Sequence, residues 1–64
     1  MKITERFKKI FPTAQVHWNY NINQLSLHFM NQKINEEEIK LKVYIELNFA
    51  GLLRAVDSVK ILSY

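Results

Sequence analysis

The side chains able to do chemistry in this 64-residue chain are few, and two histidines stand out among them. His17 and His28 lie in runs where apolar and polar residues alternate, so we expect both on the polar face of a sheet. In one hairpin register they are directly opposite, with Cβ atoms about 5 Å apart, close enough to share a zinc or copper ion. Zinc sites take three or four protein ligands, and only Glu46 is expected on the same face. We therefore predict two solvated histidines and no metal site.

The remaining acids and bases do not form a catalytic arrangement. The acidic run 36–38, Glu46 and Asp57 have no predicted nucleophile or orienting partner beside them. The chain has neither a glycine-rich phosphate loop nor a nucleophile motif, and it is too short to enclose a typical substrate pocket. We predict that the protein is not an enzyme and needs no cofactor.

A more specific candidate is an exposed aromatic residue with cationic neighbours. Tyr44 interrupts an otherwise polar series, which places its ring beside Lys40 and Lys42 on the open face of the predicted sheet. Such a residue can anchor a protein interface, or it can simply pack across strands. We take Tyr44, Lys40, Lys42, His17 and His28 as the candidate partner-binding residues.

The N-terminal segment carries a second candidate surface. Residues 3–11 have an amphipathic helical pattern that Pro12 ends, with Phe7 on its apolar side. The basic side chains of this segment could contact phosphate groups, which supports nucleic-acid binding as the alternative function: Lys2, Arg6, Lys8 and Lys9. The net charge of +3 is modest for that role.

Two alternating runs separated by asparagines predict a β-hairpin between Val16 and Met30. A two-residue loop pairs Trp18 with Phe29, whereas a four-residue loop pairs Trp18 with Leu27. Both registers keep apolar residues on one face, so the sequence does not choose between them. Trp18 and Tyr20 are expected in the core rather than as base-stacking platforms.

The longest regular pattern runs from Ile39 to Phe49, where every odd position is apolar. This alternation predicts a long strand that buries Val43 and Ile45. The rival interpretation begins a helix with the acidic turn that follows Asn35, but it spreads the apolar residues around all sides of that helix.

After Asn48 the apolar spacing becomes helical, which predicts a helix over about 49–57; a fourth strand at 59–64 is an open alternative. The predicted fold is thus one α+β domain over residues 1–64. It has an N-terminal helix, a three-stranded antiparallel sheet formed by the hairpin and the long strand, and a C-terminal helix. The order resembles the topology of double-stranded RNA-binding domains, but residues 48–51 lack the lysine-rich turn of that family, and we assign no family.

Size and composition limit the remaining choices. So short a chain buries only about 60% of its unfolded surface, and without cysteine it has no disulfide to compensate, so a homodimer is one way to gain core. No apolar run is long enough to span a bilayer, and the N-terminus lacks the pattern of a secretory signal, so we expect a cytoplasmic protein without membrane contact. The predicted function is protein–protein contact, as a regulator, inhibitor or subunit, through the open sheet face or a sheet edge.

Overall fold

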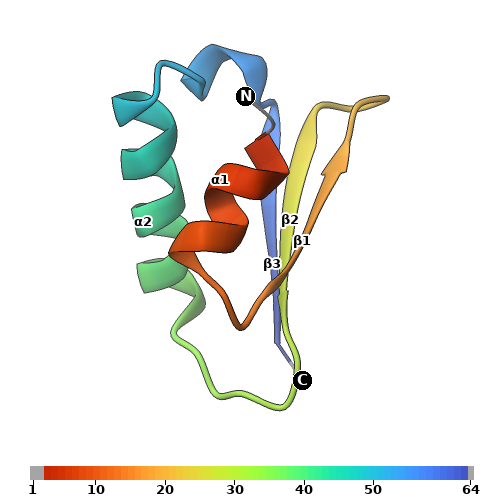
Figure 1. Ribbon diagram of the computed structural model, residues 1–64, viewed down its shortest axis with the longest axis vertical. Helices are drawn as coiled ribbons and strands as arrows, with labels where there is room; N and C mark the ends of the chain where they lie inside the picture. Colours follow the sequence, from red (N-terminus) through yellow and green to blue (C-terminus); the bar gives the residue numbers. More distant parts are fainter. Residues whose placement is uncertain (1–2, 64) are drawn as a thin grey trace.

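The computed structural model describes residues 3–63 of the chain. Two helices pack against one face of a three-stranded sheet, and the other face of the sheet is open (Figure 1). The elements in chain order are α1 (Ile3–Ile10), β1 (Gln15–Asn19), β2 (Gln24–Phe29), α2 (Glu36–Phe49), the 3-10 turn η1 (Leu53–Ala55) and β3 (Ser58–Ser63). The α+β class and the N-terminal helix are therefore as predicted.

The sheet is mixed rather than antiparallel. Its order is β1-β2-β3, with β1 antiparallel and β3 parallel to β2. Parallel neighbours need a long crossover between them, usually a helix, and α2 is that crossover. The prediction of three strands is correct, but the third strand comes from the end of the chain.

The segment predicted as a long strand, residues 39–49, forms most of α2, and this prediction is wrong. Asn35 caps the helix, because its side-chain oxygen accepts a hydrogen bond of 3.1 Å from the Glu38 backbone N–H. Three glutamates follow in the first turn, where the helix dipole favours negative charge. The rival interpretation, a helix that begins with the acidic turn after Asn35, is the correct one.

The predicted helix over 49–57 is also wrong, because α2 ends at Phe49. Gly51 adopts a φ of +73°, and two backbone hydrogen bonds close the helix end. Leu52 N–H donates to the Leu47 carbonyl at 2.8 Å, and Gly51 N–H donates to the Asn48 carbonyl at 3.1 Å, which is the Schellman pattern. The chain then makes the single turn η1 and enters β3, so the open alternative of a strand near 59–64 is confirmed over Ser58–Ser63.

The predicted hairpin is present, but its register is neither of the two considered. Trp18 is opposite Leu25, which leaves residues 20–23 in the turn. Asn23 occupies the left-handed region there, with a φ of +50°. Tyr20 is therefore 77% exposed and outside the core, whereas Trp18 packs against the core as expected.

The core lies between the sheet and the two helices. Phe7 from α1 and both Val43 and Leu47 from α2 are fully buried against it. An edge-to-face contact between the rings of Phe11 and Phe29, with centroids 5.8 Å apart, extends this packing to the end of β2. The full set of buried residues is Phe7, Ala14, Leu25, Leu27, Phe29, Val43, Leu47 and Val59.

Candidate interaction surface

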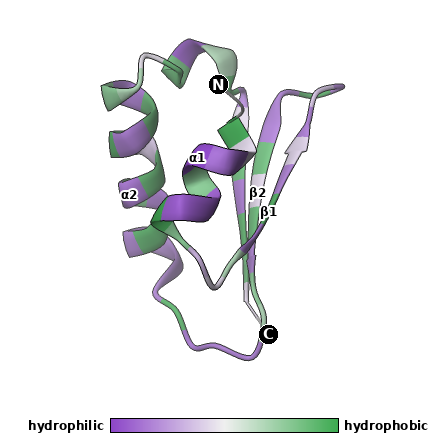
Figure 2. Ribbon diagram, viewed as in Figure 1, coloured by the Kyte–Doolittle hydropathy of each residue, from purple (hydrophilic) through white to green (hydrophobic). Residues whose placement is uncertain are grey.

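Helix α2 has two apolar faces. Val43 and Leu47 are buried, and Ile39 packs beside them against the core. The opposite face carries an apolar row that we call the outer stripe: Leu41 is 60% exposed, Ile45 60% and Phe49 83%. Apolar and polar bands accordingly alternate along the whole of α2 (Figure 2).

The alternating sequence produces these two faces directly. Each residue of an α-helix turns by about 100°, so residues two apart lie on nearly opposite sides. The apolar residues at the odd positions therefore form two rows, and within each row the residues are four positions apart. One row, Ile39, Val43 and Leu47, faces the sheet, and the outer stripe faces away from it.

The residues that flank the outer stripe are polar, and the charged side chain beside its centre is paired. Lys42 forms an ion pair with Glu38 one turn earlier, with 3.4 Å between Nζ and Oε1. Tyr44 and Asn48 lie on the other flank and are exposed. Leu53 of η1 adds a further exposed apolar side chain after the end of α2.

The predicted partner-binding residues do not share one surface. Tyr44, Lys40 and Lys42 belong to α2, whereas His17 and His28 belong to the sheet. Their predicted placement on a common sheet face is wrong, because residues 39–49 are helical.

The two histidines are not directly opposite each other either. In the observed register His17 pairs with Ser26, and His28 pairs with Gln15. Both histidines remain on the open sheet face, the face that the helices leave uncovered, because paired residues point to the same side. Among residues 3–63, no group of three His, Asp or Glu side chains could hold a metal ion.

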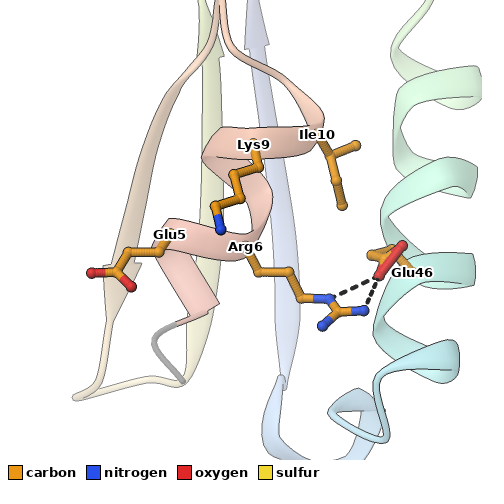
Figure 3. A pocket seen from close by; sticks show the side chains of 5 residues that line it. All are labelled: Glu5, Arg6, Lys9, Ile10 and Glu46. Carbon is orange, nitrogen blue, oxygen red and sulfur yellow. Dashed lines mark hydrogen bonds and ion pairs between the residues drawn. The ribbon is translucent and has the colours of Figure 1, made fainter.

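The basic first helix is partly occupied by contacts within the chain. Arg6 lies against Glu46 of α2, with Nε 2.8 Å and Nη2 2.5 Å from the same carboxylate oxygen (Figure 3). Lys8 Nζ donates to the Ala14 carbonyl at 2.7 Å, which ties α1 to the start of β1. Lys9 is exposed, and Lys2 lies outside the described residues.

Two shallow grooves accompany these elements. One, of about 300 Å³, lies between α1 and α2 and carries both signs of charge, from Glu5, Arg6, Lys9 and Glu46 (Figure 3). The other groove, of about 330 Å³, lies between the strand β3 and the N-terminal turns of α2. Its lining is also mixed in charge: Glu36, Glu37 and Lys40 come from α2, and Lys60 and two apolar residues come from β3.

Sequence reasoning placed the outer stripe in the core, and this was wrong for Leu41, Ile45 and Phe49. The signal that could have found it is the helix start at Asn35, combined with the two rows of spacing four within the alternation. Val43, the other core residue named from the alternation, is buried as expected.

None of the helices in residues 3–63 combines the length and the apolar character that crossing a bilayer requires. Comparisons of the chain with protein-family models, with curated proteins and with solved structures found no match.

Proposed function

We propose that this is a non-enzymatic binding protein that acts by protein–protein contact through the outer stripe of α2. The observation that carries the proposal is the exposure of three large apolar side chains in one row: Leu41, Ile45 and Phe49. A regulator, an inhibitor or a subunit of a larger assembly would each use such a surface.

The outer stripe places three exposed apolar side chains on successive turns of one helix. Single exposed apolar residues are normal in proteins, but exposed apolar patches larger than a few hundred Å² mark interaction sites. A helix presenting apolar side chains at i, i+4 and i+8 is the form in which many helical binding surfaces engage a partner. Phe49 is well suited as an anchor, because aromatic residues contribute strongly at interface centres.

The alternative of nucleic-acid binding is less well supported by the contacts. It relies on Lys40, Lys42 and Tyr44 together with the basic residues of α1. Arg6 and Lys8 are engaged within the chain, and Lys42 is paired with Glu38. A phosphate-binding surface would need these cations to exchange their present partners for phosphate oxygens.

The proposal is tested by affinity capture from the cells in which the chain is made. The bait is the wild-type chain or a variant with Leu41→Gln, Ile45→Gln and Phe49→Gln together. The matched control carries Tyr20→Gln and Ile22→Gln, which change exposed apolar residues in the hairpin turn instead. Circular dichroism checks that each bait is folded.

We expect the wild type and the hairpin control to capture the same protein chains, including any untagged copy of this chain, and the α2 variant to lose them. Capture that survives in the α2 variant contradicts the proposal. Capture that nuclease treatment or rising salt removes from every bait supports the nucleic-acid alternative instead, because phosphate contacts weaken steeply with salt.

A further inference from the structure

Resting on the protein-binding role proposed above for the outer stripe, we infer that its occupant is a second copy of this chain. The two α2 helices pack antiparallel about a two-fold axis that passes close to Ile45. The spacing of the outer stripe suits this arrangement, since Leu41 and Phe49 lie the same distance on either side of Ile45. In a two-fold pair, Leu41 of each copy therefore faces Phe49 of the other.

The charges at the two ends of α2 favour the antiparallel direction. Glu36, Glu37 and Glu38 are exposed in its first turn. Beyond Leu47, by contrast, the chain carries no acidic side chain before Asp57, and Arg54 is exposed there. An antiparallel pair brings the glutamates of one copy toward the Arg54 end of the other, whereas a parallel pair would bring the two acidic turns together.

The helix dipoles favour the same direction. The N-terminus of a helix carries partial positive charge and the C-terminus partial negative charge, so side-by-side helices attract when they run in opposite directions. The last turn of α2 contains no basic residue to offset the partial negative charge of the helix C-terminus, so that end can attract the N-terminal end of a neighbouring helix.

The rest of the molecule leaves room for a second copy. The exposed residues of the outer stripe lie opposite the row of α2 that packs on the core, so pairing through the stripe moves neither α1 nor the strands. Figure 1 shows α2 at the outside of the molecule. The contacts of Val43 and Leu47 with the hydrophobic core stay intact.

The area available predicts a weak dimer. With Tyr44 and Leu53, the outer stripe offers roughly 500 Å² of exposed side-chain surface per copy, judged from the exposed fractions and typical side-chain areas. Stable, specific interfaces bury about 800 Å² per partner. We therefore expect a reversible dimer that forms at micromolar concentrations and above, rather than a permanent one.

Disulfide trapping tests both the contact and its direction, because the natural chain has no cysteine to interfere. The single variants Ile45→Cys, Leu41→Cys and Phe49→Cys are each oxidised mildly. A mixture of Leu41→Cys with Phe49→Cys is oxidised in the same way. Lys60→Cys, an exposed position on the open sheet face, is the matched control. Analytical ultracentrifugation of the wild type accompanies the trapping.

The expected pattern follows from the two-fold axis. Ile45→Cys forms a covalent dimer, and so does the mixture, whereas Leu41→Cys alone does not, because its two copies lie about 12 Å apart along the helices. Lys60→Cys forms no dimer above background. The wild-type mass rises with concentration from 7.7 kDa toward twice that value.

Other patterns overturn the inference. Trapping of Leu41→Cys and Phe49→Cys each with itself, but not with each other, indicates a parallel pair. A wild-type chain that stays at 7.7 kDa and traps nowhere has no second copy on the stripe. In that case, α2-dependent capture of a different protein leaves the proposed function standing, whereas loss of such capture removes both. A chain that stays monomeric but sediments with phosphatidylcholine–phosphatidylglycerol vesicles has a lipid surface as its occupant.

Discussion

Val43 and Ile45 provide a sharp comparison, because they lie two residues apart and have opposite environments. Val43 is fully buried, and Ile45 is 60% exposed. Replacing Val43 with alanine removes two buried methyl groups, which costs about 1.6 kcal/mol by transfer alone and about 2–3 kcal/mol with the cavity included. Replacing Ile45 with alanine loses little burial and gains some helix propensity, so the expected cost is about 0.5 kcal/mol or less.

Urea unfolding followed by circular dichroism measures both costs, at a concentration low enough to keep the chain monomeric. A 64-residue domain is expected to be stable by about 3–10 kcal/mol. The Val43→Ala change would therefore remove a large share of the stability and lower the urea midpoint by about 1–2 M. Equal losses for Val43→Ala and Ile45→Ala would refute the helical assignment, since both side chains share one buried face only in a strand.

Three further predictions concern the contacts that position α2. A double-mutant cycle with Arg6→Met and Glu46→Gln, measured by urea unfolding, should give a coupling free energy of about 1–2 kcal/mol, because the two side chains are only about a quarter exposed and their hydrogen bonds are charge-assisted. A coupling free energy near zero would show that the pair does not hold α1 to α2. Asn35→Ala should cost about 1 kcal/mol by removing the N-cap, while Asn35→Asp keeps most of it, and equal losses would contradict the capping role. Gly51→Ala should lower the melting temperature through its φ of +73°, with a cost of about 1 kcal/mol and less for Gly51→Asn, whereas an unchanged temperature for alanine would argue against the left-handed helix end.

The parts of the fold that sequence reasoning predicted correctly are those where one pattern fits one structure. Phe7 in a short amphipathic helix and Trp18 in the first hairpin strand are examples. The register of the hairpin was not predictable, because shifting the pairing by two residues keeps the same faces together. Trp18 opposite Leu25 is as consistent with the alternation as the two pairings that were considered.

The larger error concerns residues 39–49, where the alternation fits two structures. A segment with an apolar residue at every second position also has one at every fourth position. As a helix, the same segment can therefore bury one row of apolar side chains. The local start signals decided the outcome: Asn35 caps the helix, and the glutamates favour its first turn. Tertiary context contributes as well, since β3 can pair parallel to β2 only if the crossover returns the chain to the same end of the sheet.

The same ambiguity hid the candidate site. The strand interpretation places Ile45 and Phe49 in the core, whereas the helix exposes both side chains. The cations and Tyr44 were then grouped with the histidines of the sheet, which the helix also separates. A correct helix assignment would have divided the odd positions into two rows and identified the outer one without a structure.

The claim that the outer stripe binds a second copy is tested most directly by a dilution series followed by methyl NMR. The account predicts that the methyl resonances of Leu41 and Ile45 shift with concentration between the micromolar and millimolar ranges. The resonances of buried Val43 and of Leu62 in β3, on the open sheet face, should stay unchanged. Methyl resonances of the outer stripe that do not move with concentration, or shifts confined to Leu62, would contradict it.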